Sequence, residues 1–376
     1  MTTDTVGGVF HYALGLCRAF SNAGVQVGLA SMGPAASSDQ RARLAEIPGL
    51  TFFESEFELE WKDEPWSDVG RAGDWLLGVA AKLQPDLVHL NGYCHAQLDW
   101  RVPTLVVAHS CVASWWQAVL GEPAPERYAE YRRRVGEGLA SADAVVAPSH
   151  AMLEALQQQH GRQERAHVIP NGIEPALFRS AAKEPFFLAA GRLWDQAKNL
   201  TLLQQAVSEL PWPLHLAGEA PPSTSSPSGM RLLGRLPQAE LASEMSRASV
   251  FVHPAKYEPF GLAPLEAAAS GCALLLGDIP SLREVWGDAA DYVAPDDLAA
   301  LVTKARRLAL DHDHRMSMAR RAHQRAQRFR LDTSARAYLR LYAELGTGSV
   351  FAAVGSPRTR PKSHARPGPV RLEEPR

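Results

Sequence analysis

Short apolar stretches alternate with amphipathic stretches along most of this chain, and the alternation limits the folds that the chain can adopt. Continuous apolar strands separated by helices are typical of parallel sheets that are covered by helices on both faces. The sequence therefore predicts the α/β class. The apolar stretches that end in turn or polar residues lie at 25–32, 86–90, 104–109, 144–149, 167–172, 186–192, 214–219, 249–254 and 273–278.

The chain length indicates two domains, because 376 residues exceed the usual size of a single domain. We expect a first domain at 1–180 and a second at 184–328, with the polar stretch 180–185 as the crossing between them. The last segment, 350–376, is basic and rich in proline and lacks the apolar content that ordering requires. We expect this tail to be disordered.

The first domain has an unusual start. An α/β nucleotide-binding half usually begins with an apolar strand, followed by a glycine-rich turn and a helix. Here Gly7 and Gly8 precede a helical pattern, but only MTTDTV comes before them. We therefore expect the first strand of this domain to be missing or clipped.

Composition and charge exclude several classes of partner. The net charge is -2 and 21% of the residues are charged, which gives no electrostatic reason to expect nucleic acid or an anionic membrane. The four cysteines are scattered without metal-ligand spacing, and no apolar run approaches the ~20 residues that span a bilayer. We expect a cytoplasmic chain with reduced cysteines.

The stretch YEPFGLAPLEAAASG, residues 257–271, combines a helix start with two glutamates. Pro264 suits the first turn of a helix and Gly271 suits its end. Backbone N–H groups at such a start lack partners and bind phosphate through their direction and the helix dipole. We therefore expect an anion site directly before Pro264.

Glu258 lies in the loop before this helix, and Glu266 lies about one turn inside it. A carboxylate accepts two hydroxyl hydrogen bonds at once, which suits a vicinal diol. A phosphate at the helix start with a diol on each side would satisfy the arrangement, and this is the shape of a nucleoside diphosphate sugar. Two glutamates near a helix start, taken alone, are more often explained by capping and solvation.

The segment AAGRLWDQAKN, residues 189–199, places two cations after an apolar strand. Ligands of α/β sheets bind at the carboxyl ends of the strands. Arg192 and Lys198 are therefore able to neutralise a diphosphate leaving group there. Such a pair, taken alone, is more often solvated surface charge.

Together these segments resemble the retaining glycosyltransferases of family 4, whose GT-B fold has two facing Rossmann-like domains and a deep cleft between them. The resemblance extends over residues 3 to 345, roughly. In the family's order, the matching segments are GGVFHYALGLCRAF, PDLVHL, VVAHS, ADAVVAPS, VIPNGIEPALF, AAGRLWDQAKN and EPFGLAPLEAAASG.

The resemblance implies roles for five residues. Glu266 would bind the nucleotide ribose, and Glu258 would face the hydroxyl groups of the donor sugar. Arg192 and Lys198 would hold the diphosphate and stabilise its charge as it leaves. His109, at the end of the stretch 104–109, matches the family's histidine beside the donor sugar and the acceptor, although a single histidine at a strand end is more often structural.

The resemblance also implies a donor-binding set that works largely through the backbone. We expect the Gly7–Gly8 turn to complete the anion site from across the cleft, and Asn171 to be mainly structural. The helix at 330–345 looks like the family's closing helix, which returns to the first domain. The expected donor-binding residues are Gly7, Gly8, Asn171, Phe260, Gly261, Leu262 and Glu266.

The implied reaction moves a hexose-type sugar from a UDP- or GDP-sugar to a sugar, lipid or small-molecule acceptor, with retention at the anomeric carbon. The acceptor hydroxyl attacks from the side of the leaving group, and the phosphate takes its proton. We expect no cofactor and no metal, because the Asp-x-Asp stretch at 311–313 reads as an exposed helix end. Partners would be the donor and a carbohydrate or lipid-linked acceptor, without nucleic acid; peripheral membrane contact stays open.

Other interpretations remain. Sugar-nucleotide epimerases and sugar-phosphate synthases share the architecture, and a non-catalytic sugar-nucleotide-binding protein is favoured if the first strand is missing. A dinucleotide-binding oxidoreductase is disfavoured because GGVFHY departs from GxGxxG. Trp115 and Trp116 follow a strand of the first domain and either stack on an acceptor or pack in the core.

Overall fold

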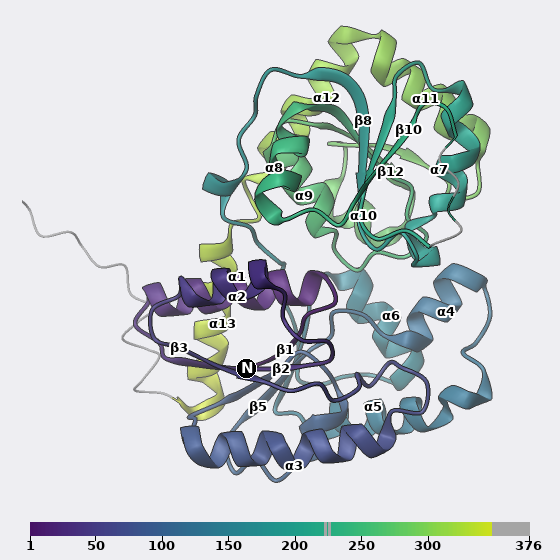
Figure 1. The fold of residues 1–376 in the computed structure, drawn as a ribbon. Coiled ribbons are helices and arrows are strands. Elements are labelled where there is room, and N and C mark those ends of the chain that lie inside the picture. Colours follow the sequence, from purple (N-terminus) through teal and green to yellow (C-terminus); the bar gives the residue numbers. More distant parts are fainter. Residues whose placement is uncertain (222–223, 225–226, 348–376) are drawn as a thin grey trace, which may run out of the picture.

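The computed structural model describes residues 1–221, 224 and 227–347. The tail expected to be disordered, 350–376, lies outside the described residues. Two α/β lobes face each other across an interface along which helix α1 lies, with the N-terminal lobe below and the C-terminal lobe above in Figure 1. The chain thus has the predicted α/β class with two Rossmann-like domains.

All strands of the first domain run parallel within two ladders, in the order β1-β2-β3 and β4-β5-β6-β7. The two ladders meet where Asn91, just after β4, bonds to Thr2: its backbone N–H donates to Thr2 Oγ1 at 2.9 Å and its side-chain amide donates to Thr2 O at 2.7 Å. The strands are β1 (Thr2–Asp4), β2 (Val27–Met32), β3 (Leu50–Glu54), β4 (Val88–Leu90), β5 (Thr104–Val107), β6 (Ala144–Ala147) and β7 (Ala166–Val168).

The first strand, which was expected to be missing or clipped, is present: Thr2–Asp4 form the three-residue β1 and pair with Ala30–Met32 of β2. The expectation that it is missing was therefore wrong. These residues are too polar to be recognised as a buried strand in the sequence. Threonine nevertheless suits strands because it is β-branched. Thr2 and Thr3 are buried, and the Asn91 N–H bond to Thr2 Oγ1 makes the burial of that hydroxyl tolerable.

The second domain has one parallel sheet of six strands in the order β10-β9-β8-β11-β12-β13. Its central strands β8, β11 and β12 are buried almost throughout, which explains their continuous apolar sequence. The strands β3, β10 and β13 were not predicted from the sequence. The strands are β8 (Glu184–Ala190), β9 (Leu214–Ala217), β10 (Met230–Gly234), β11 (Ala248–His253), β12 (Ala273–Gly277) and β13 (Asp291–Val293).

Helices cover both sheets, and α13 returns from the second domain to pack on α1 of the first, as the yellow helix of Figure 1 shows. The helices are α1 (Gly8–Asn22), α2 (Ser38–Ala45), α3 (Trp66–Leu83), α4 (Val112–Leu120), α5 (Ala129–Ser141), α6 (His150–His160), α7 (Leu200–Ala206), α8 (Gln238–Arg247), α9 (Leu262–Ala269), α10 (Pro280–Trp286), α11 (Leu298–Leu310), α12 (His312–Ala326) and α13 (Leu331–Tyr342), with the short 3-10 helix η4 (Gln196–Lys198).

The two crossings between the domains touch each other. Ile173, on the first crossing, forms a parallel bridge with Arg330, on the second. A Cβ on Gly172 would lie 2.5 Å from the carbonyl carbon of Arg330, so only glycine allows this close approach. The turn that contains Asn171 therefore ties together the two segments about which the domains are joined.

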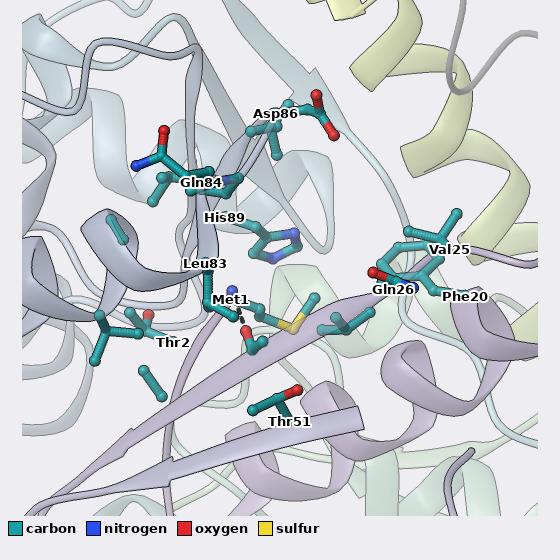
Figure 2. A pocket seen from close by; sticks show the side chains of 18 of the residues that line it. Met1, Thr2, Phe20, Val25, Gln26, Thr51, Leu83, Gln84, Asp86 and His89 are labelled. Atoms are coloured by element: carbon teal, nitrogen blue, oxygen red, sulfur yellow. Dashed lines mark hydrogen bonds between the residues drawn. The ribbon is translucent and has the colours of Figure 1, made fainter. Parts of the chain in front are cut away.

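A large cavity of about 520 Å³ lies at the amino edge of the first sheet, where β2 and β4 extend beyond the start of β1. Figure 2 shows Met1 at this cavity, with its ammonium group donating to the Gly28 carbonyl at 2.7 Å. None of the predicted site residues lines it. The cavity is at the opposite edge of the sheet from the carboxyl ends of the strands, so it is separate from the site described next.

Candidate active site

The starts of helices α1 and α9 face each other across the interdomain cleft. A Cβ on Gly7 would lie 3.6 Å from Arg192 Cδ, and a Cβ on Gly8 would lie 3.8 Å from Leu262 Cδ1. Both distances are ordinary van der Waals contacts, so they show how near the backbone of the first domain lies to the cation and to the helix start of the second. Four of the predicted site residues, Gly7, Gly8, Arg192 and Leu262, come together here.

The start of α9 is built to leave backbone donors open. Gly261 has φ +92°, a left-handed conformation that favours glycine, and no side chain caps the helix. The first N–H groups of a helix have no partner within the helix. With a phosphate-sized anion at this position, these N–H groups and the helix dipole would both act on its charge.

Glu258, Lys198 and His253 form a buried cluster beside this helix start. Lys198 Nζ donates to Glu258 Oε2 at 2.6 Å, and His253 Nε2 lies 3.1 Å from the same oxygen. Burial acts to raise the pKa of Glu258, but the Lys198 charge and the His253 hydrogen bond outweigh it and hold this pKa well below its ordinary value. Glu258 is therefore a carboxylate at neutral pH and accepts hydrogen bonds rather than donating a proton.

Arg192 is held by a bridge between the two domains. Its Nη2 donates to Asp195 Oδ2 at 3.1 Å, and the indole N–H of Trp115, on α4 of the first domain, donates to Asp195 Oδ1 at 3.0 Å. Asp195 also accepts from the backbone N–H of Ala197 at 3.0 Å, which fixes its position at the start of η4. Trp115 thus contributes to the domain interface through its polar edge.

His109 lies at the end of β5 and its protonation is set by Asn91. The Asn91 amide donates to Thr2 O, so its oxygen faces His109 Nε2, at 2.8 Å. A carbonyl oxygen only accepts, so the proton of the neutral imidazole sits on Nε2 and Nδ1 keeps its lone pair. Burial lowers the pKa of His109 to about 3, so the ring is neutral at physiological pH. Tyr12 packs edge-on against it, with ring centroids 4.5 Å apart.

Glu266 differs from Glu258 in every contact. It lies one turn inside α9, where the described residues offer its carboxylate no hydrogen bond, and it lines a small cavity with residues of α1. Burial raises its pKa to about 7, against a smaller opposite effect of the Arg43 charge. Its carboxyl group is thus open to a ligand that can donate hydrogen bonds.

Two predicted donor-binding residues lie away from this centre. The Phe260 ring is buried and packs on Phe329, with centroids 5.4 Å apart, so its side chain belongs to the core of the second domain. Asn171 is buried at the domain crossing, with no hydrogen-bond partner for its Oδ1 in the described part of the chain.

Sequence reasoning missed Asn91, His253 and Asp195. Asn91 directly follows β4, His253 ends β11, and Asp195 lies within the Arg192–Lys198 segment. Their position at or near the ends of strands was the signal that could have identified them. What could not be deduced from spacing is which of these polar groups contact one another.

Contacts outside the site also join the two domains. Both carboxylate oxygens of Glu284, on α10, accept backbone N–H groups of His150 and Ala151 at the start of α6, each at 2.8 Å. The Ser149 hydroxyl donates to the Pro259 carbonyl at 2.7 Å. A carboxylate at a helix start is favourable for the dipole as well as for the donors. These contacts keep the loop that carries Glu258 against the first domain.

Solved structures share this architecture and define its class. The chain aligns with a sucrose-phosphate synthase from Thermosynechococcus elongatus with a TM-score of 0.78 and 20% identity, over 93% of this chain and 99% of that chain. It aligns with WaaG, a glycosyltransferase involved in lipopolysaccharide biosynthesis, with a TM-score of 0.70 and 15% identity, over 92% and 98% of the two chains. The predicted GT-B fold is confirmed.

The sequence itself shows the family. Residues 6–177 match the model of Glycosyltransferase Family 4, and residues 184–311 match that of Glycosyl transferases group 1. The chain is 27% identical to a D-inositol 3-phosphate glycosyltransferase of Xylanimonas cellulosilytica over 91% of this chain and 93% of that protein. It is 28% identical to a glycogen synthase of Mycobacterium tuberculosis over 66% of each. The protein belongs to the family 4 glycosyltransferases, as its motifs predicted.

None of the helices that the structure describes is both long enough and apolar enough to cross a bilayer.

Asp311, in the Asp-x-Asp stretch, caps α12 by accepting the His314 N–H at 2.9 Å.

Proposed function

We propose that this chain transfers a hexosyl group from a nucleoside diphosphate sugar to a hydroxyl acceptor, with retention at the anomeric carbon and without a metal ion. The observation that carries the proposal is the meeting of Arg192, Lys198 and the open start of α9 at one point of the cleft. Three sources of positive potential around one position suit a diphosphate whose charge increases as it leaves.

The proposed step breaks the bond between the anomeric carbon and the diphosphate oxygen and forms a bond from the acceptor oxygen to the same carbon. The acceptor's proton passes to an oxygen of the departing phosphate. Glu258, held ionised by Lys198, does not act as the acid; it accepts hydrogen bonds from the donor sugar. His109 offers the lone pair of Nδ1 to a hydroxyl group near the anomeric carbon.

Known proteins support a uridine nucleotide as the first donor to test. Anabaena Alr3699/HepE, whose structure was solved in complex with UDP-glucose, aligns with a TM-score of 0.72 and 17% identity over 91% of this chain and 99% of that chain. An O-antigen chain mannosyltransferase also matches over a shorter part, 19% of each chain, so GDP-sugars belong in the same test. The relatives' names differ in acceptor, and we leave sugar, lipid and small-molecule acceptors as candidates.

We also propose a reducing, cytoplasmic setting, since the four cysteines are all buried and free of disulfides. Peripheral membrane contact would depend on a lipid-linked acceptor. The products of the reaction distinguish a transferase from the alternatives. An epimerase would give an epimerised donor, a sugar-phosphate synthase would give a phosphorylated sugar, and a non-catalytic nucleotide-sugar-binding protein would give no product.

The first experiment is a thermal-shift series with UDP, GDP and ADP, each with and without EDTA. A ligand that binds only the folded chain raises the apparent Tm by mass action. We expect one nucleotide to raise the Tm, with the same shift in EDTA. A shift that EDTA abolishes would contradict metal independence, and no shift with any nucleotide on folded protein would contradict the proposed function.

A further inference from the structure

One arginine of the first domain lies in the cleft beside Glu266 without a carboxylate at ion-pair distance. Arg43, at the end of α2, lines the same small cavity as Glu266 on α9. Arg18, which also lines it, pairs with two carboxylates. Among the described residues Arg43 forms no ion pair, and its guanidinium donates only to His11 Nδ1, at 3.4 Å. A half-buried guanidinium with a single weak neutral partner retains most of its capacity to donate hydrogen bonds and to attract an anion.

Glu266 presents the complementary situation from the other domain. Its carboxylate has no hydrogen-bond donor in the described part of the chain, and the nearby Arg43 charge acts to lower its pKa. The two groups face one cavity but do not form an ion pair. Ligand atoms that approach Glu266 from the cleft therefore come close to Arg43 as well.

We propose that Arg43 is a positioning residue for the nucleoside half of the donor, and supplies the positive charge that faces Glu266 across the ribose site. The inference rests on the proposed nucleotide-sugar function. Both oxygens of Glu266 are free to accept from the two ribose hydroxyls when it is a carboxylate, whereas the protonated form turns one oxygen into a donor. Because burial raises its pKa to about 7, a nearby cation decides how much of it is ionised at neutral pH.

The other titratable and charged groups at the cavity differ from Glu266. Desolvation, with the charges of Arg43 and Arg235, lowers the pKa of His11 to about 4, although this residue is exposed. Burial raises the pKa of Tyr12 far above neutrality. Arg18 and Glu174 lie 3.7 Å apart and offset each other. The titratable or charged groups that line the cavity with Glu266 are His11, Tyr12, Arg18, Arg43 and Glu174.

The test measures the affinity of UDP, or of GDP if the wild-type chain prefers it, by calorimetry between pH 5.5 and 8.5. We compare the wild type with Arg43→Ala, Arg43→Lys and Glu266→Gln. Arg41→Ala is the matched control, since Arg41 is on the same helix but exposed and paired with Glu54. The phosphates of the nucleotide titrate equally in all five proteins, so differences between them report on the protein.

We expect wild-type affinity to decrease as the pH falls through about 7. In Arg43→Ala the midpoint should move up by about one pH unit, which gives a loss of about tenfold at pH 6.5 and a much smaller loss at pH 8.5. Arg43→Lys should restore the midpoint, Glu266→Gln should remove this pH dependence, and Arg41→Ala should match the wild type. Each variant is first shown to be folded by its Tm, with Arg43→Gln replacing Arg43→Ala if the latter does not fold.

Two results would overturn the inference. One is an Arg43→Ala profile equal to that of the wild type, and the other is a loss that is the same at every pH, which would place the action of Arg43 elsewhere than on Glu266. A wild-type chain that binds neither UDP nor GDP would instead contradict the proposed function itself, so the two failures are distinguishable.

Discussion

Glu258 and Glu266 are separated by seven residues in one stretch of sequence, yet they occupy opposite electrostatic environments. Glu258 touches Lys198 and His253, which keep its pKa below the ordinary value in spite of burial. Glu266 has no such contacts, so burial raises its pKa to about 7. Glutamate is therefore ionised at neutral pH at position 258, whereas at position 266 it titrates near neutral pH.

The difference follows from what each glutamate faces. Glu258 belongs to a cluster whose members all lie in the second domain. Glu266 instead lines a cavity that it shares with Arg43 of the first domain. We infer that the proposed sugar half of the site is built mainly by the second domain, whereas the proposed nucleoside half draws on both domains.

Removing Lys198 should have the largest effect on this comparison. Lys198→Ala takes away a cation at the proposed leaving group, and we expect turnover to fall by about 100- to 1000-fold, as for the loss of one preorganised donor. It should also lower stability by about 3 kcal/mol, because the largely buried Glu258 carboxylate loses its counter-charge and keeps only the His253 hydrogen bond. Steady-state kinetics and urea unfolding measure the two effects.

The double variant Lys198→Ala/Glu258→Gln is the control for this prediction. It removes the unpaired charge, so it should recover stability without recovering turnover. Recovery of both would mean that Lys198 acts only as a structural partner of Glu258.

Glu266→Ala and Glu258→Ala should distinguish the binding of the nucleotide half of the donor from that of its sugar half. Glu266→Ala is expected to weaken binding of the bare nucleoside diphosphate by about tenfold, the effect of about 1.4 kcal/mol from lost hydrogen bonds to a charged group. Glu258→Ala should leave this affinity within about threefold of the wild type and lose turnover instead. Calorimetry with UDP or GDP, together with a transfer assay, checks both. Equal losses of nucleotide affinity in the two variants would contradict the assignment.

The smallest expected effect is a difference in how stability depends on pH: Glu266→Gln and Glu258→Gln should change it in opposite directions. The folded-state pKa of Glu266, about 7, lies above its ordinary value of 4.5, so wild-type stability from this group is lost as the pH rises between these values. Glu266→Gln should thus gain about 1–2 kcal/mol relative to the wild type between pH 5 and pH 8.

The lowered pKa of Glu258 makes stability depend on pH in the opposite direction. Its ionised form stabilises the fold above the ordinary pKa, and this contribution is lost as the pH falls below it. Glu258→Gln should be less stable than the wild type at pH 7, with a deficit that narrows in acid. Urea unfolding curves at several pH values measure both differences, and parallel profiles for the two variants would show that their environments are alike.

Much of the fold could be predicted because its elements are local. Continuous apolar stretches marked the buried strands, and the helix at 330–345 was expected where α13 forms. The strand β1 was not expected, since burying its two threonines requires a partner for each hydroxyl. Asn91 provides one for Thr2, and the Asp4 carbonyl provides one for Thr3. The strands β3, β10 and β13 are partly exposed and have mixed sequences, so no apolar run marks them.

The residues of the site were predictable as candidates, but their contacts were not. Gly261 and the two glutamates could be recognised because a helix start and its flanking acids are close in sequence. Lys198 lies 60 residues from Glu258, and Trp115 lies 80 residues from Asp195, so no spacing rule relates them. Phe260 belonged to the predicted segment, yet its ring points into the core.

The sequence by itself determined the α/β class, the two-domain division, the family and the chemical kinds of group at the site. These depend on periodicity, composition and short motifs, which are properties of neighbouring residues. Only the tertiary structure decided that Glu258 is ionised at neutral pH, that His109 Nε2 faces the Asn91 oxygen, and that Glu266 shares a cavity with Arg43. A charge state depends on burial and on atoms within a few ångströms, and folding brings these from distant parts of the chain.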